Sequence, residues 1–302
     1  MIPMHLPSRL TTVIALVAVA AGIALDRPEP AATLPPPGRV AVLVLENRSY
    51  EQVVGNPHAP FLNGLARRYA LGTNYFALGH PSLPNYIALT GGNTNGIDAN
   101  CTHCDTEKGN LLNQLDTAHV SWRAYFEGLR PGAALVARTH IYNPHYDPFG
   151  YYERLERSDG ARDRIVNFVR LRRDLRHHAL PRFSWIAPNV FHDGHNGTLA
   201  TADRYAAQLV PQLLRELGPR GVLYVLWDEG PNSDLRGAGG GEGGGHIPLI
   251  AAGGAARAHA RDSTAANHYA LLKTIETQLR LPLLGHAADS GTPLLSGLVK
   301  PQ

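Results

Sequence analysis

The feature that most constrains the fold is the continuous apolar run RVAVLVLEN at residues 39–47. The run is short, contains β-branched valines and ends in a carboxylate and an amide, a pattern typical of a strand buried on both faces of a sheet. Similar apolar runs follow at residues 182–189, 221–230 and 246–254. We therefore expect a buried sheet with residues 39–47 near its centre.

Segments with the helical spacing of apolar residues alternate with these strands. They lie at residues 60–69, 84–91, 202–217 and 267–281, and residues 109–129 combine a helix with a following strand. Asn267 is expected to cap the last helix, and Pro211 to kink the helix that contains it. The glycine-rich stretch at residues 237–245 predicts a flexible loop. The alternation predicts an α/β fold with a central, largely parallel sheet flanked by helices on both faces.

The N-terminal residues differ from the rest of the chain. Residues 10–25 are uncharged and mostly apolar, which is short for a membrane span of about 20 residues but fits the core of a secretory signal. We predict a signal peptide at residues 1–25, with an uncleaved membrane anchor as the alternative. Residues 26–38 are proline-rich and predict a linker, which leaves residues 39–302 as one domain. We expect the protein to be secreted or held in the periplasm or cell envelope.

Charge and cysteine content narrow the classes of partner and cofactor. The 302 residues carry a formal net charge of only +3, and no basic run interleaved with aromatic residues indicates nucleic-acid binding. Nothing indicates an obligate protein partner. Cys101 and Cys104, in CTHC, are the only cysteines, so a zinc ribbon lacks its second pair. Because loop-forming residues precede them and export is expected, we predict a structural disulfide rather than a redox pair.

Polar side chains follow three of the predicted strands: Glu46 and Asn47, Asp193 and His195, and Asp228 and Glu229. Because parallel strands end at one edge of a sheet, these side chains are expected to converge there. Glu46, Asp228 and Glu229 carry about three negative charges, which repel one another unless a cation lies among them. A divalent metal ion is the simplest solution, and His195 or His246 could add a nitrogen ligand. Taken singly, each pair is also compatible with a turn or a cap.

Ser82 lies in GHPSLPNYIALTGG, between Pro81 and Pro84. Serine is a common helix N-cap, so a cap is the simplest interpretation of this stretch alone. A metal ion beside the hydroxyl would lower its pKa enough for nucleophilic attack. Backbone N–H groups at the start of the following helix would then face an anion. Serine, metal and helix N-terminus together predict the cleavage of a phosphate ester.

Five motifs resemble those of a known family in the same order: VLVLENRSYEQVVGN, HPSLPNYIALTGG, PRFSWIAPNVFHDGH, VLYVLWDEG followed by GGHIPLI, and NHYALLKTIE. Together they are similar to the bacterial phosphoesterase family, which contains acid phosphatases and phosphatidylcholine-type phospholipases C and lies within the alkaline phosphatase superfamily. The resemblance extends over nearly the whole predicted domain. It implies an alkaline-phosphatase-like fold and a metal-dependent hydrolase that works through a phosphoserine intermediate.

The resemblance also implies a role for each matching residue. The implied metal ligands are Glu46, Asn47, Ser82, Asp228, Glu229 and His246. The implied catalytic residues are Ser82, as the nucleophile, with Asn85, Asp193 and His195. Other histidines, among them His80 and His268, are interpreted as structural. Oxygen ligands suit Ca²⁺, Mg²⁺ or Mn²⁺, whereas a histidine ligand favours Zn²⁺ or Mn²⁺.

Two departures from the family bear on the substrate. Tyr146, in HYDPF, occupies a position at which relatives often carry histidine, so His145 becomes a candidate contact to phosphate from a shifted register. The long C-terminal extension of larger phospholipases C is missing, which favours an acid-phosphatase-like phosphomonoesterase acting on small phosphate esters. The alternatives are a phospholipase C or other phosphodiesterase acting on phospholipid head groups, and a binding module without activity. A sulfatase would need an arginine shortly after Pro84, and none is there.

Overall fold

The structure is a computed structural model that describes residues 1, 38–156 and 158–300. The predicted signal peptide or anchor, and the predicted linker up to residue 37, lie outside the described residues. Within the part of the chain that the structure describes, no helix is long and apolar enough to cross a membrane.

Eight strands form one sheet, and the apolar run at residues 39–47 supplies one of its inner strands. In spatial order they are β5 (Ile165–Asn167), β4 (Trp122–Phe126), β6 (Phe183–Ala187), β1 (Val40–Leu45), β7 (Val222–Trp227), β8 (Leu249–Ala252), β2 (Ala70–Gly72) and β9 (Arg261–Asp262). β1 pairs with β6 on one side and with β7 on the other. All residues of β1 and β7 are buried, which confirms β1 as a central strand covered on both faces.

The sheet is largely parallel, as predicted, but β8 runs against both of its neighbours, β7 and β2. A loop with one 3₁₀ turn, η3 (Ala238–Gly240), joins β7 to β8. A parallel pairing would instead require a crossover that returns the chain to the other end of the sheet. A second, two-stranded sheet pairs β3 (Tyr75–Phe76) with β10 (Ala266–Asn267).

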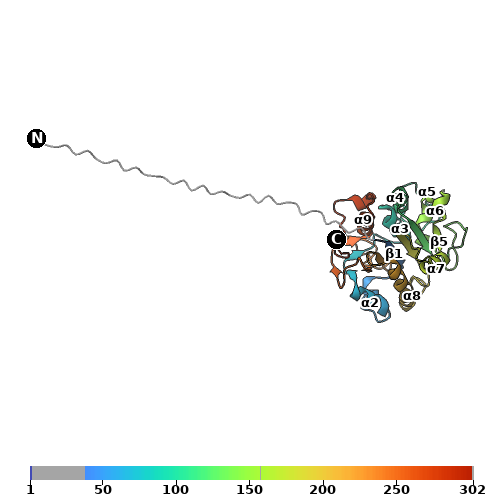
Figure 1. Ribbon diagram of the computed structural model, residues 1–302, viewed down its shortest axis with the longest axis horizontal. Coiled ribbons are helices and arrows are strands. Elements are labelled where there is room, and N and C mark those ends of the chain that lie inside the picture. Colours follow the sequence, from blue (N-terminus) through green and yellow to red (C-terminus); the bar gives the residue numbers. More distant parts are fainter. Residues whose placement is uncertain (2–37, 157, 301–302) are drawn as a thin grey trace. The chain divides into compact units, whose positions relative to one another are not determined.

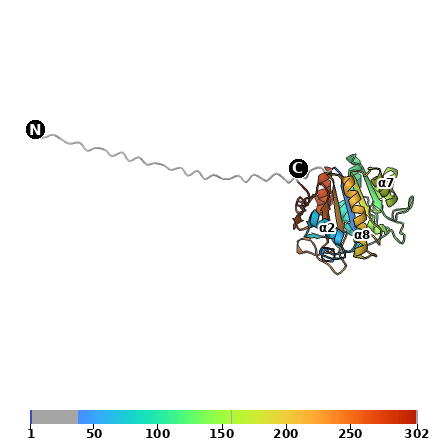
Figure 2. The same cartoon turned by 60° about the horizontal axis from the view of Figure 1, so that its bottom comes forward.

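Helices cover both faces of the large sheet, as predicted. One contacting group consists of α2 (Pro60–Arg68), α7 (Phe168–Arg176) and α8 (Leu199–Leu217), and the other of α3 (Ser82–Gly91), α4 (Leu111–Thr117) and α9 (His268–Leu279). Figure 1 shows the two groups on opposite sides of β1, and Figure 2 brings α2, α7 and α8 forward. The shorter helices are α1 (Tyr50–Val53), α5 (Glu153–Glu156), α6 (Asp159–Arg162), η1 (Pro144–Tyr146), η2 (Pro148–Tyr151) and η4 (Gly285–Ala288).

Helix ends follow local side-chain chemistry. The Asn267 side chain accepts a hydrogen bond from Tyr269 N at 3.1 Å, so the predicted cap of α9 is confirmed. α8 begins three residues before its predicted start, because Thr198 caps it by accepting from Thr201 N. Pro211 lies inside α8, which continues on both sides of it to Leu217.

The glycine-rich stretch at residues 237–245 is more ordered than the predicted flexible loop. Gly244 N donates to Ala77 O at 3.1 Å, and Ala77 N donates to Gly245 O at 3.0 Å. A Cβ on Gly244 would lie 2.2 Å from the carbonyl oxygen of Gly79. Glycine is needed here because two backbones approach closely. The stretch thus supports the segment that leads to Ser82.

Candidate active site

Ser82 is the first residue of α3, and its hydroxyl does not cap the helix. The hydroxyl donates to Glu229 Oε1 at 2.9 Å and lies 3.3 Å from Glu46 Oε2. The interpretation of Ser82 as a simple N-cap therefore fails. The serine faces two carboxyl groups that come from the ends of different strands.

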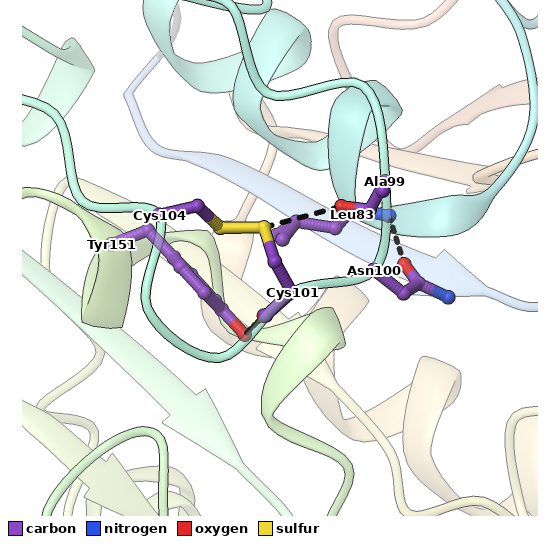
Figure 3. The surroundings of a disulfide bond; sticks show 6 residues. All are labelled: Leu83, Ala99, Asn100, Cys101, Cys104 and Tyr151. Atoms are coloured by element: carbon purple, nitrogen blue, oxygen red, sulfur yellow. Dashed lines mark hydrogen bonds between the residues drawn. A yellow bond between two sulfur atoms is a disulfide. The ribbon is translucent and has the colours of Figure 1, made fainter.

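A side chain from another segment accepts a hydrogen bond from a backbone N–H in the first turn of α3. Asn100 Oδ1 accepts a hydrogen bond from Leu83 N at 3.0 Å (Figure 3). The neighbouring Cys101 forms the predicted disulfide with Cys104, and its carbonyl oxygen accepts from the Tyr151 hydroxyl. The Leu83 N–H is thus occupied, so it is not one of the groups free to bind an anion. The disulfide loop instead helps to position the helix that carries Ser82.

Neighbouring strands bring the two acidic pairs together. Leu45, the last residue of β1, is paired with Trp227, the last residue of β7, so the residues that follow emerge side by side. Asn47 N donates to Asp228 Oδ1 at 3.0 Å, and Asn47 Nδ2 donates to Glu229 Oε1 at 3.0 Å. We call Glu46, Asp193, Asp228 and Glu229 the carboxyl cluster. Its members are all almost fully buried.

Burial and mutual repulsion raise the pKa values of the carboxyl cluster. Burial, with Glu229 as the next cause, raises the pKa of Asp228 from 3.8 to about 8. Burial also raises the pKa of Asp193 to about 8. For Glu46, burial and then Asp228 and Asp193 raise the pKa well above 4.5. Among the described residues no arginine or lysine pairs with these groups, so their ionised forms are strongly disfavoured without a cation.

Several buried oxygens at this edge of the sheet have no hydrogen-bond partner among the described residues: Asn47 Oδ1, Asp193 Oδ2, Asp228 Oδ2 and the Tyr146 hydroxyl. In residues 38–156 and 158–300, no three His, Cys, Asp or Glu side chains form an arrangement that would by itself hold a metal ion. The donor set nevertheless fits one, because an amide and a hydroxyl oxygen add to the carboxylates. Such oxygen-rich sets suit Ca²⁺, Mg²⁺ or Mn²⁺.

His80 belongs to the site, although its sequence position was interpreted as structural. Its Nδ1 is hydrogen-bonded to Glu229 Oε2, and its Nε2 lies 3.0 Å from Asp234 O. Asp234 also lines an open depression of about 660 Å³, together with Ser49 and Pro231. His80 therefore connects Glu229 to the wall of that depression. Its place two residues before the serine was the signal available in the sequence.

Tyr86 and His268 also contact the carboxyl cluster. The Tyr86 hydroxyl donates to Glu46 Oε1. Tyr86 is one helical turn after Ser82, so both face the same way. His268 Nε2 lies 2.7 Å from Asp228 O, and its Nδ1 lies 3.0 Å from the Tyr75 hydroxyl. Burial lowers the pKa of His268 to about 4, which favours its neutral form.

The side chains of four predicted site residues make their hydrogen bonds to groups outside the carboxyl cluster. His246 stacks on Tyr50, and its ring nitrogens lie 3.0 Å from Glu51 Oε1 and 3.1 Å from Thr73 O. This arrangement does not bring His246 to the carboxyl cluster. Asn85 accepts from Leu78 N at 2.9 Å and donates to Gly79 O at 2.7 Å. It therefore shapes the loop before Ser82.

The other two are histidines near the rim. His195 is exposed, with its Nδ1 2.7 Å from Asn196 Oδ1, while its backbone N donates to Asp193 Oδ1 at 2.7 Å. His145 Nδ1 lies 3.5 Å from Arg138 Nη2. Burial and then Arg138 lower the pKa of His145 to about 4. This contact does not join His145 to the carboxyl cluster.

Comparisons with known proteins identify the family of this chain. The model of the Phosphoesterase family matches residues 56–282. Phosphatidylinositol-3-phosphatase of Mycobacterium tuberculosis (strain ATCC 25618 / H37Rv) is 30% identical over 267 residues, which cover 86% of this chain and 83% of that protein. The phosphate-repressible acid phosphatase of Penicillium chrysogenum is 29% identical over 263 residues, covering 83% of this chain but only 61% of that protein.

Solved structures show the same fold at low sequence identity. An alkaline phosphatase superfamily protein from Vibrio parahaemolyticus superposes with a TM-score of 0.59 at 13% identity, over 88% of this chain and 72% of that one. Murine ectonucleotide pyrophosphatase/phosphodiesterase 5, solved with AMP, gives 0.55 at 11% identity, over 87% and 100%. The chain therefore belongs to the phosphoesterase family of phosphoric ester hydrolases and has the fold of the alkaline phosphatase superfamily.

Proposed function

We propose that this protein is a metal-dependent phosphomonoesterase in which Ser82 is the nucleophile and becomes transiently phosphorylated. The observation that carries the proposal is the Ser82 hydroxyl, which starts α3 and donates to Glu229 Oε1 at 2.9 Å within a buried carboxyl cluster. A hydroxyl needs help to attack at neutral pH, and a carboxylate in hydrogen-bond contact can accept its proton.

The residues that would hold the metal are Glu46, Asn47, Ser82, Asp228 and Glu229. Asn47 Oδ1 and Asp228 Oδ2 support this assignment because both are buried without a partner among the described residues. A bound divalent ion would neutralise the carboxylates and lower the pKa of the serine hydroxyl. His246 is left out because Glu51 and Thr73 occupy its ring nitrogens.

The chain's own residues account for the first half of the reaction. Ser82 Oγ attacks phosphorus while its proton passes to Glu229 Oε1. The bond from phosphorus to the leaving oxygen breaks, and that oxygen keeps the bonding electron pair and takes a proton from solvent, to which Glu229 returns its own. Asn85 and the glycine-rich stretch hold residues 77–81, which fixes the direction of the attacking oxygen. Water then cleaves the phosphoserine, which returns a proton to Ser82 and releases phosphate.

Replacing the nucleophile tests this proposal. We expect Ser82→Ala to lower kcat with p-nitrophenyl phosphate by about 100-fold or more, because no other group can form the covalent intermediate. Mass spectrometry of acid-quenched wild type should detect one added phosphoryl group on the peptide that contains Ser82. Ser184→Ala is the matched control, since Ser184 is a buried serine in β6 whose hydroxyl has no partner among the described residues. A folded Ser82→Ala enzyme with more than a few per cent of wild-type activity would contradict the assignment.

The same assay separates the candidate substrates. Phosphomonoesterase activity predicts turnover of p-nitrophenyl phosphate with little turnover of bis(p-nitrophenyl) phosphate, and a phospholipase C or other phosphodiesterase predicts the reverse. The mycobacterial relative is named for a phosphatidylinositol 3-phosphate substrate, so a short-chain phosphoinositide monoester is the second monoester to test. Export is part of the proposal as well, because a disulfide persists in oxidising compartments.

A further inference from the structure

The Tyr146 hydroxyl is a buried donor at the site that the described residues leave unused. Its oxygen is buried and has no hydrogen-bond partner among them. The Tyr146 ring lies between the rings of Tyr86 and His195, with centroid separations of 6.0 Å and 6.1 Å. Tyr86 touches Glu46, and His195 is exposed. Tyr146 is therefore placed between the buried carboxyl cluster and the rim of the site.

The side-chain donors that contact the carboxyl cluster are occupied. Asn47 Nδ2 and the Ser82 hydroxyl both donate to Glu229 Oε1, and the Tyr86 hydroxyl donates to Glu46. His80 is bonded to Glu229 and lies within hydrogen-bond distance of a backbone carbonyl oxygen. A phosphate ester brings several acceptor oxygens, so it requires donors that the carboxyl groups have not already taken.

The surroundings of Tyr146 keep its hydroxyl protonated. Burial, followed by the nearby Glu46 and Asp193, raises the pKa of Tyr146 far above 10. The Asn143 side chain approaches and lowers this pKa by less, without reaching hydrogen-bond geometry. A protonated hydroxyl among acidic groups acts as a donor. A buried donor without an acceptor destabilises the ligand-free protein, and an incoming acceptor would relieve that cost.

We propose that the Tyr146 hydroxyl donates a hydrogen bond to a phosphoryl oxygen of the substrate attacked by Ser82. The proposal rests on the proposed function, because it takes Ser82 as the position of the reacting phosphorus. The contact strengthens as charge builds on the phosphoryl oxygens, so it stabilises the transition state as well as bound phosphate. His145, the alternative from the sequence, points to Arg138 instead.

Tyr146→Phe tests the proposal because it removes one oxygen and keeps the ring. We expect kcat/KM for p-nitrophenyl phosphate to fall by about 10- to 100-fold, as for the loss of one donor to a developing oxyanion. The inhibition constant of inorganic phosphate should rise about tenfold. The melting temperature should stay the same or increase, because the lost hydroxyl makes no hydrogen bond to the described residues.

Tyr224→Phe is the matched control. Its hydroxyl is also buried, but it donates to Gln278 Oε1 at 3.0 Å in the middle of β7, away from the strand ends. We expect this variant to lose stability and to keep kcat/KM and phosphate inhibition per folded molecule. The two tyrosines should therefore show opposite patterns of stability and activity.

The outcomes separate this proposal from the proposed function. A wild type without phosphatase activity would contradict the proposed function itself. An active wild type whose folded Tyr146→Phe variant retains kcat/KM and phosphate inhibition would overturn the role of Tyr146 alone. Tyr146→Leu, which removes the same donor with different packing, carries the same expectation if Tyr146→Phe fails to fold.

Discussion

At the scale of single residues, the buried carboxyl groups of the site lower the stability of the metal-free protein. Glu46, Asp193, Asp228 and Glu229 are almost fully buried, and His80 is the one basic side chain among the described residues that pairs with them. Buried carboxyl groups without a cation become protonated rather than ionised. The carboxyl cluster should therefore destabilise the metal-free protein wherever the pH would ionise these groups in the unfolded chain.

Asp228→Asn should show this cost directly. The pKa of Asp228 is about 8 in the folded protein and near 3.8 when unfolded, so between these values the folded state binds more protons. The free energy of unfolding of the metal-free wild type therefore falls as the pH rises from about 4 to about 8. Asparagine does not ionise, so the variant should be more stable at pH 9 by about 2–5 kcal/mol, although it loses activity.

Urea unfolding in the presence of a chelator, at pH 5 and pH 9, measures this effect. Asp98→Asn is the control, since Asp98 is exposed and its replacement should change stability by less than about 0.5 kcal/mol at either pH. An Asp228→Asn variant less stable than wild type at pH 9 would show that its carboxylate is stabilised in the folded state, contrary to our account.

At the scale of elements, α3 is held by segments distant in sequence. Asn100 satisfies Leu83 N beside the disulfide, while the glycine-rich stretch pairs with residues 77–79 in front of Ser82. These contacts give Ser82, the proposed nucleophile, a fixed direction, which is worth far more to catalysis than to stability. Small shifts in either support should therefore lower activity before they unfold the protein.

Gly244→Ala tests the support from the glycine-rich stretch. Its Cβ would lie 2.2 Å from Gly79 O and 2.8 Å from Ala77 Cβ, so the segment before Ser82 must move. We expect kcat to fall by about 10-fold or more, with a loss of about 1–3 kcal/mol in stability. Gly241→Ala is the control, because the nearest atom to its Cβ is 4.0 Å away. Equal activity of the two variants would show that this packing does not position Ser82 for catalysis.

At the scale of the whole molecule, the sheet's topology assembles the site. Glu46 and Asp228 follow adjacent parallel strands, and Asp193 comes after β6 on the other side of β1. α3 packs against α9 on one face and brings Ser82 to the same edge. Open α/β sheets commonly carry their sites at this edge. A ligand that binds across these strand ends should therefore stabilise the whole sheet.

Metal binding should raise the melting temperature of the protein as a whole. An ion at 100 times its dissociation constant adds about 2.7 kcal/mol, which corresponds to roughly 5 °C or more for a chain of this size. We expect chelator-treated enzyme to be inactive and to regain both activity and stability with one of Ca²⁺, Mg²⁺, Mn²⁺ or Zn²⁺. Asp228→Asn should lose the shift. Full activity without metal, with no thermal shift for any of the four ions, would contradict the metal site.

The sequence alone determined the features that depend on local patterns. Continuous apolar runs specified the buried strands, Asn267 specified the cap of α9, and the polar residues after β1 and β7 identified the acidic pairs. Each signal spans a few neighbouring residues, so a single stretch of chain contains it. Five ordered motifs were sufficient to predict the family, and the short CTHC loop was sufficient to predict the disulfide.

The tertiary structure decided which distant residues meet. It turned β8 antiparallel, packed the glycine-rich stretch against residues 77–79, and placed His80 on Glu229 and Tyr86 on Glu46. It also paired His246 with Glu51 rather than with the carboxyl cluster. These outcomes depend on the packing of elements far apart in the chain, where many side chains compete for one volume and one set of hydrogen-bond partners. No local sequence pattern determines which side chains pair, so these contacts are fixed only when the sheet and its helices are packed together.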